Sequence, residues 1–210
     1  MEKLIRSKKF SGPQGPAVLV IMDGIGIGKF EEGDIVRKAN TPTLDWLSRN
    51  AVATQLEAHG TAVGMPSDSD MGNSEIGHNA IGCGRVFEQG ASLVNQSIKS
   101  RSIFKGDVWK ELIENAIHHD SRLHFIGLFS DGNVHSHIDH LEALLTEAKK
   151  EGVKKAGVHI LLDGRDVSPT SALDYVDRFE AFLDLLRRDC DIDFAIASGG
   201  GRMKITMDRY

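Results

Sequence analysis

Apolar and polar positions follow a regular strand–helix alternation over the second half of the chain. Three short apolar runs have the length and branched content of buried strands: Leu123–Phe129, Val158–Leu162 and Ile192–Ala197. Three further segments show helical spacing of their apolar positions: Val108–Ile117, His140–Lys150 and Ser171–Arg188. The last of these has one apolar stripe, made of Leu173, Val176, Phe179, Phe182, Leu183 and Leu186. Strands that alternate with helices in this way predict a parallel α/β sheet.

The first half of the chain is less regular. Residues 1–16 are polar and are expected to be an extension, and Ala17–Met22 is predicted to be a buried strand that ends in a glycine turn. Thr41 and Pro42 are typical of a helix N-cap and first helical position. Seven glycines between residues 60 and 90 predict a long shaped loop or a series of short helices. A domain boundary is expected near Phe87–Ser92.

Composition narrows the class of protein. The 210 residues are 40% hydrophobic and 26% charged, which excludes a disordered or fibrous chain. A formal charge of −5 argues against a general nucleic-acid binder. The apolar run Ala17–Met22 is too short to cross a membrane or to act as a signal peptide, and two cysteines make no disulfide framework. We therefore expect a soluble cytoplasmic protein that binds neither nucleic acid nor membrane.

Polar motifs follow each of the three later strands. Because ligands of open parallel sheets bind beyond the carboxyl ends of the strands, these motifs are expected to meet in one crevice. The crevice would hold His135, Arg165, Asp166 and Arg202, with Arg209 following shortly after. Several arginines in one crevice suit a phosphate or carboxylate group, which they can bind in bidentate fashion. The alternative is that these are ordinary polar loops with surface arginines.

Asp23 follows the first apolar run directly and precedes the glycines of a Gly-Ile-Gly-Ile-Gly stretch. It is either a turn residue or a ligand of a divalent metal, for which carboxylates are suited. The glycine spacing differs from the dinucleotide-binding pattern, so that interpretation is weak.

Ser74 lies among small residues in Asp70-Met-Gly-Asn-Ser-Glu-Ile-Gly-His78. Small neighbours leave a serine open to attack a substrate, and a helix that begins there would favour an anion. The alternative is that Ser74 only caps that helix.

His135, His137 and His140 form the pattern H-x-H-x-D-H, which is the zinc motif of metallo-β-lactamase-like hydrolases. A zinc hydrolase is therefore a competing hypothesis, although such a site needs further histidines downstream and only His159 follows, inside a predicted strand. Some of these histidines could instead cap the helix that is expected to start near Asp139.

Together these segments resemble the cofactor-independent (2,3-bisphosphoglycerate-independent) phosphoglycerate mutases, within the alkaline phosphatase superfamily. The matching motifs occur in the family's order over residues 18–210: VLVIMDGIGIG, NTPTLDWL, MGNSEIGHNAIGCGRV, SDGNVHSHIDH, LLDGRDVSPTSA and SGGGRMKITMDRY. One departure is Asn133, where the family pattern leads us to expect a second glycine.

The resemblance implies an isomerase that interconverts 3-phosphoglycerate and 2-phosphoglycerate in glycolysis and gluconeogenesis, without 2,3-bisphosphoglycerate. Ser74 would be the nucleophile that becomes phosphoserine. Ser74 and Asp23 would also be ligands of two divalent metal ions, usually manganese. The substrate would be held by the residues of the predicted crevice, His135, Arg165, Asp166, Arg202 and Arg209.

The same resemblance implies a three-layer, parallel-sheet α/β architecture. Residues 17–88 would be the first segment of an alkaline-phosphatase-like metal-binding domain, and 89–210 an inserted α/β transferase domain that is incomplete at its C-terminal end. The family is longer than this chain and carries most of its metal ligands later, so we expect a segment that is inactive alone and a full-length protein that is a monomer. A metal-dependent hydrolase and a non-catalytic phosphoglycerate-binding module stay open as alternatives.

Overall fold

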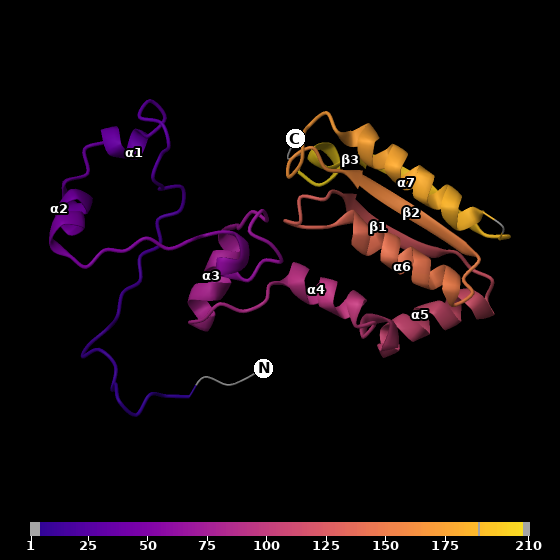
Figure 1. The fold of residues 1–210 in the computed structure, drawn as a ribbon, viewed down its shortest axis with the longest axis horizontal. Coiled ribbons are helices and arrows are strands. Elements are labelled where there is room, and N and C mark those ends of the chain that lie inside the picture. Colours follow the sequence, from indigo (N-terminus) through magenta and orange to yellow (C-terminus); the bar gives the residue numbers. More distant parts are fainter. Residues whose placement is uncertain (1–4, 189, 208–210) are drawn as a thin grey trace. The chain divides into compact units, whose positions relative to one another are not determined.

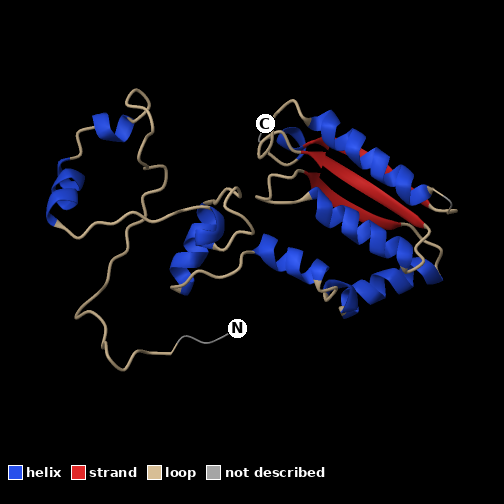
Figure 2. Cartoon of the chain, viewed as in Figure 1, coloured by secondary structure: helices blue, strands red, loops and turns tan. Residues whose placement is uncertain are grey.

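The computed structural model describes residues 5–188 and 190–207, which belong to two compact units, Met1–Gln55 and Leu56–Tyr210. In the first unit, residues 5–34 form neither helix nor strand (Figure 2). Two helices follow, α1 (Ile35–Lys38) and α2 (Pro42–Asn50). Helix α2 begins at the predicted Pro42 with Thr41 as its N-cap residue, although the Thr41 hydroxyl donates to Asp45 Oδ1 at 3.2 Å rather than capping the backbone.

The prediction of a buried strand at Ala17–Met22 is wrong for this structure. These residues form no strand, and their side chains are exposed, with Val18 at 82%. A strand is stable only when its backbone groups pair with a neighbour. The described residues supply no such partner, because the sheet is built entirely from later strands.

The second unit begins with short helices linked by glycine-rich turns, as predicted for residues 60–90. It contains η1 (Gly60–Val63), α3 (Ser74–Cys83), α4 (Gly90–Lys99), η2 (Ile103–Lys105) and α5 (Asp107–His118). Gly64 ends η1 at a φ of +85°, and a Cβ there would collide with the carbonyl oxygen of Phe87. The turn therefore requires glycine both for its left-handed backbone and for this close approach.

The alternating part of the chain folds as predicted. Its elements are β1 (Leu123–Phe129), α6 (Ile138–Lys150), β2 (Lys155–Leu162), α7 (Ala172–Arg187), β3 (Asp193–Gly201) and α8 (Arg202–Ile205). The strands form a parallel sheet in the order β1-β2-β3 (Figure 1). Each crossover runs through a helix, which confirms the predicted parallel α/β sheet.

Helices α6 and α7 pack side by side on one face of this sheet. The buried core lies between them and the strands, and its largest fully buried side chains include Phe129, Phe179 and Phe194. On the other face Ile126 is 79% exposed, so the described residues form two of the three expected layers. The predicted stripe of α7 is buried at Phe179 and Leu183, but Leu173, in the first turn, is exposed, so its assignment to the core is wrong.

Strand β3 is longer than predicted and continues past Ala197 to Gly201. Gly199 permits this, because a Cβ there would lie 2.8 Å from Cγ1 of Ile160 on the neighbouring strand. Arg202 consequently begins α8 at the end of the strand rather than lying in a loop.

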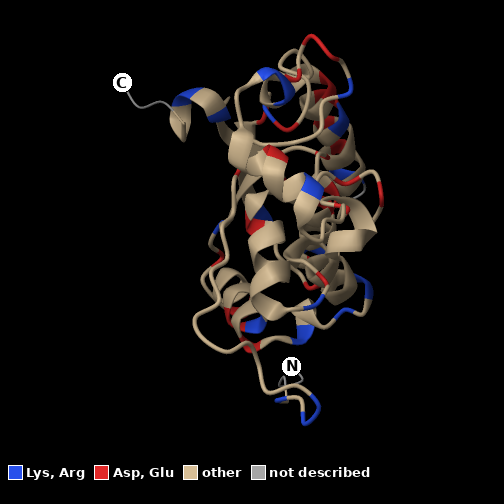
Figure 3. Ribbon diagram, turned by 90° about the vertical axis from the view of Figure 1, so that its left-hand side faces the viewer, with Lys and Arg blue, Asp and Glu red and all other residues tan. Residues whose placement is uncertain are grey.

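Two surface properties bear on the composition argument. Basic and acidic residues are interspersed along the ribbon (Figure 3). Among residues 5–188 and 190–207, no helix has the length and apolar content needed to cross a membrane.

Candidate active site

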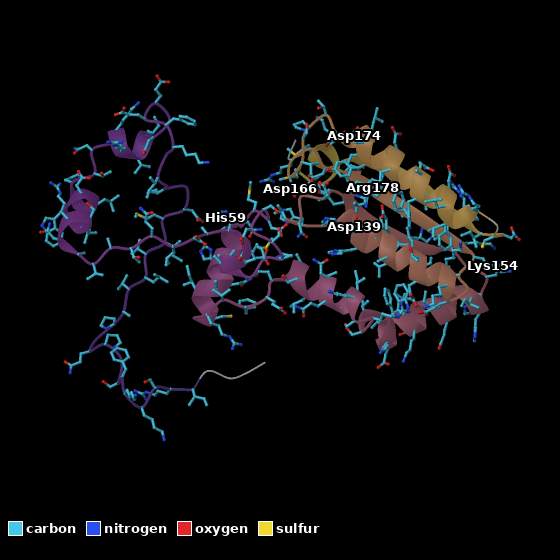
Figure 4. The ribbon with its side chains drawn as sticks, viewed as in Figure 1. His59, Asp139, Lys154, Asp166, Asp174 and Arg178 are labelled. Carbon is cyan, nitrogen blue, oxygen red and sulfur yellow. The ribbon has the colours of Figure 1, made fainter. Side chains whose placement is uncertain are left out.

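The carboxyl ends of β2 and β3 bring two of the predicted site residues together. The Arg202 Nη1 atom lies 2.6 Å from Asp163 Oδ1 and 2.7 Å from Asp166 Oδ2. The side chains of Asp163 and Arg202 are buried and that of Asp166 is 9% exposed, and Asp166 lies at the end of the sheet that holds the strand-end loops (Figure 4). The strand-end rule therefore placed Asp166 and Arg202 correctly, but it did not anticipate that Arg202 pairs with carboxylates of its own chain.

Asp163 is the residue of this site that the sequence analysis missed. Its Oδ1 atom accepts the backbone N–H groups of Arg165 and Asp166, both at 3.2 Å, as well as the guanidinium of Arg202. Burial opposes ionisation, but hydrogen bonds from Ser130, from these N–H groups and from the guanidinium outweigh it and hold the pKa of Asp163 below its usual 3.8. The signal in the sequence was an aspartate directly after a strand and before a glycine, because this pattern is typical of a turn in which the aspartate side chain accepts backbone N–H groups.

Arg165 differs from Arg202 in its surroundings. Its side chain is exposed, and its Nη1 atom lies 3.1 Å from the sulfur of Met207. Within the part of the chain that the structure describes, it is ion-paired with no carboxylate. Its guanidinium can therefore bind an external anion without first breaking an internal pair.

His135 lies on the loop between β1 and α6. It is exposed and lines a cavity of about 330 Å³ together with residues of the first turns of α3 and α4, namely Asn73, Glu75, Ile76, Gln89 and Gly90. Arg165, Asp166 and Arg202 are not among the residues that line it. The loop of His135 nevertheless touches the Asp166 segment, because a Cβ on Gly132 would lie 2.9 Å from the Asp166 carbonyl oxygen.

Ser74 is the first residue of α3, and its side chain is exposed. Asn73, not Ser74, is the N-cap: its Oδ1 atom accepts the N–H of Ile76 at 3.0 Å. The alternative role of Ser74 as the cap is therefore wrong, since that position is already filled. The positive end of the helix dipole stabilises negative charge in the first helical turn. A negatively charged group attached to an exposed hydroxyl there would therefore be favoured.

His78, one turn along α3, contacts Ser74 twice. Its Nδ1 atom lies 2.7 Å from the Ser74 carbonyl oxygen and 3.1 Å from Ser74 Oγ. Because a carbonyl oxygen can only accept, Nδ1 carries the hydrogen in this arrangement and donates towards both oxygens. His78 is thus placed to orient the hydroxyl, and the i, i+4 spacing within a predicted helix was the signal for this pair.

The three histidines of the zinc motif lie near one another, with the rings of His137 and His140 5.7 Å apart, but they do not form a metal-ligand group. His137 Nδ1 accepts the backbone N–H of Asp139 at 3.2 Å and caps α6, as the alternative interpretation predicted. His140 Nε2 lies 2.6 Å from Asn95 Oδ1, and burial, with a smaller effect of His137, lowers the pKa of His140. No three His, Cys, Asp or Glu side chains among residues 5–188 and 190–207 are grouped to hold a metal ion, so a zinc hydrolase finds no support here.

Two predicted site residues lie outside this geometry. Asp23 belongs to the first compact unit, on an exposed turn after the apolar run. Arg209 lies outside the described residues.

Comparison with known proteins decides the family. Residues 94–210 match the family model of the BPG-independent PGAM N-terminus. The chain belongs to the BPG-independent phosphoglycerate mutase family. A probable 2,3-bisphosphoglycerate-independent phosphoglycerate mutase of Leptospira interrogans is 53% identical over 206 residues, which are 97% of this chain and 37% of that relative. A mutase of Arabidopsis thaliana is 46% identical, over 94% of this chain and 36% of its own length.

A solved structure agrees with this assignment. The crystal structure of Leishmania mexicana phosphoglycerate mutase at low cobalt concentration superposes with a TM-score of 0.79 and 49% sequence identity, covering 90% of this chain and 35% of that one. This chain of the mutase family therefore spans little more than a third of the length of the relatives it matches.

Proposed function

We propose that this chain supplies the serine nucleophile and a phosphoglycerate-binding lobe of a cofactor-independent phosphoglycerate mutase. The reaction is the interconversion of 3-phosphoglycerate and 2-phosphoglycerate in glycolysis and gluconeogenesis, in the cytoplasm, by a protein that is monomeric at full length. The observation that carries the proposal is the buried network of Asp163, Asp166 and Arg202 beside an exposed Arg165, in a chain of this family.

Each part of that network has a role in holding an anionic substrate. Arg165, exposed at the end of β2, is suited to bind the phosphate or carboxylate of phosphoglycerate in bidentate fashion. Arg202 balances the charge of Asp166, which leaves the second carboxylate oxygen of Asp166 to accept a glycerate hydroxyl. Arg209 and His135 complete the proposed substrate-binding set. Asp163 holds the backbone of the loop and does not itself contact the substrate.

Ser74 is the proposed phosphoryl acceptor. Its Oγ atom forms a bond to phosphorus while the bond from phosphorus to the substrate oxygen breaks, and the released hydroxyl of glycerate takes up the proton that Ser74 loses. The glycerate reorients in its lobe, and its other hydroxyl then attacks the phosphoserine, so that the serine is restored. The first turn of α3 favours the phosphoserine state, because its N–H groups and dipole stabilise added negative charge.

The resemblance to the family implies two divalent metal ions, manganese in the usual case. Asp23 and Ser74 offer oxygen ligands of a suitable kind, but two ligands are too few for a catalytic pair of ions. The described residues contain no group of three ligating side chains, so the residues present do not make up that site. No step above is therefore derived through a metal.

Calorimetry with 3-phosphoglycerate tests the binding lobe. We expect Arg165→Ala to weaken binding by about tenfold or more, because a charged hydrogen bond is worth about 1.5–3 kcal/mol. Arg178→Ala is the matched control, since Arg178 lies on α7 and pairs with Asp139 and Glu142 on α6. Affinity that is lost in Arg165→Ala and unchanged in Ser74→Ala is the result that a non-catalytic phosphoglycerate-binding module would give. Equal affinities of the Arg165 and Arg178 variants would remove the binding role of Arg165.

A second measurement concerns the activity of this chain by itself. Incubation with 3-phosphoglycerate and Mn²⁺ is expected to give no 2-phosphoglycerate above the buffer control, since only two of the implied metal ligands are present. Electron paramagnetic resonance of added Mn²⁺ should likewise show the ion free at equimolar protein. The Arabidopsis thaliana mutase, assayed in parallel, is the positive control. Turnover by the 210-residue chain would contradict the expectation.

A further inference from the structure

One hydrogen bond joins the segment before Ser74 to the loop that carries His135. The side-chain amide of Asn133 donates through Nδ2 to Asp70 Oδ1 at 3.0 Å, across 63 positions of sequence. Both residues belong to the second compact unit. Nothing in the mechanism proposed above uses this contact.

The acceptor is held firmly. The second oxygen of Asp70, Oδ2, accepts the backbone N–H of Ser67 at 2.7 Å and its hydroxyl at 2.9 Å. The carbonyl oxygen of Asp70 accepts the N–H of Gly60 at 3.0 Å. Asp70 is thus fixed at its backbone and at both side-chain oxygens, so a group that binds Oδ1 is bound to the whole turn that leads into α3.

The donor is equally constrained. Asn133 is buried, and its φ of +57° lies in the left-handed region, which asparagine, aspartate and glycine tolerate best. The family pattern led us to expect glycine at this position. Glycine would satisfy the backbone equally well but would have no amide to donate. The side chain of Asn133 therefore adds a contact that the turn itself does not need.

The contact lies next to the cavity that holds His135. Asn133 and His135, on the loop after β1, line this cavity together with Asn73 and Ile76 at the start of α3. The hydrogen bond from Asn133 to Asp70 therefore ties together two of the segments that line the cavity. Ser74 lies between Asn73 and Ile76, so its distance from His135 depends on this link.

We propose that Asn133 and Asp70 are positioning residues that hold the first turn of α3, with Ser74, against the His135 loop. This inference rests on the proposed function for the identity of Ser74 and His135 as site residues. The geometric part of it, the docking of α3, does not depend on activity and can be measured separately.

The two native cysteines suit that measurement. Cys83, half-buried, ends α3, and Cys190, exposed, follows α7 at the far end of the sheet. Nitroxide labels on both cysteines, whose separation is measured by pulsed electron–electron double resonance, report the position of α3 relative to the α/β core. The parent chain is expected to give one narrow distance distribution. Asn133→Gly keeps the left-handed turn but removes the donor, and it should broaden and shift the distribution.

A rescue experiment separates this link from a general loss of packing. Asn133→Asp places a carboxylate against Asp70 and should broaden the distribution at neutral pH, because like charges at hydrogen-bond distance repel. Adding Asp70→Asn restores an amide–carboxylate bond in the reverse direction and should return the narrow distribution. Asn115→Asp, on the exposed face of α5, is the control for an added charge. Thermal melts of each variant show whether the core remains folded.

The outcomes decide the docking and the site role separately. An unchanged distribution in Asn133→Gly, or a folded Asp70→Asn/Asn133→Asp variant that stays broad, overturns the docking role. Calorimetry with 3-phosphoglycerate on Asn133→Gly tests the link to the site, where weaker binding is expected. A shifted distance with parental affinity overturns the assignment of this link to the site. Failure of the proposed function would give a different result, because the parent chain itself would then bind no phosphoglycerate.

Discussion

Asp163→Ala is expected to lower the free energy of unfolding by about 3 kcal/mol or more, because it breaks a buried ion pair by removing one partner. The side chain of Asp163 is fully buried, and that of Arg202 is 8% exposed. The substitution leaves the guanidinium of Arg202 with only Asp166, and it frees two backbone N–H groups of the loop after β2. Urea unfolding followed by circular dichroism measures the loss, and phosphoglycerate binding should fall with it.

Asp184→Ala provides a matched control for this expectation. Its pair with Arg187 has the same 2.6 Å separation, but Asp184 is 72% exposed. Exposed pairs contribute about 0–1 kcal/mol, since water screens them in both states. If both variants lost the same free energy of unfolding, burial would add nothing to the stabilisation that the Asp163–Arg202 pair provides.

Acid sensitivity gives an independent check on the same carboxylate. Although burial alone would raise it, hydrogen bonds hold the pKa of folded Asp163 below 3.8. The contribution of ionised Asp163 to the free energy of unfolding is therefore complete above the pKa of about 3.9 in the unfolded chain. It is lost as the pH falls through the lower pKa of the folded state. The difference in stability between the parent and Asp163→Ala should be constant from pH 7 to about pH 5 and should shrink below about pH 4. A difference that grows towards acid would contradict the assignment.

The regular elements after residue 107 could be predicted because their patterns are locally complete. Each strand of the sheet has its pairing partners among the described residues, and the helices α6 and α7 bury their apolar stripes on those strands. Ala17–Met22 carries an equally strong apolar pattern, yet it forms no strand here. An apolar run predicts what a segment can do, but a strand also requires a neighbour, which is not a local property.

The position of two residues at the sheet edge was predictable, but their pairing was not. The strand-end rule predicted Asp166 and Arg202 at this edge and treated both as residues that face a ligand. The structure shows that Arg202 instead pairs with two carboxylates, and one of them, Asp163, was in the motif but was not singled out. Spacing along the chain cannot show which of several charges at one sheet edge will pair, because that depends on side-chain directions and on burial.

The largest effect on stability is expected from Phe179→Ala in the core of α7. Phe179 is fully buried and packs edge-to-face on Phe129 with ring centroids 4.8 Å apart. Removing a buried phenyl ring costs about 3–5 kcal/mol, because the cavity left behind collapses only in part. Phe129 is the last residue of β1 and directly precedes the loop that carries His135, so this packing also supports the site.

Ile126→Ala on the open face of the same sheet is the control for Phe179→Ala. Ile126 is 79% exposed, so its truncation should change the free energy of unfolding by about 0.5 kcal/mol or less. Urea unfolding of both variants compares the covered and the open face directly. A comparable loss from Ile126→Ala would mean that this face of the sheet is covered in solution, and the two-layer arrangement of the described residues would then be incomplete.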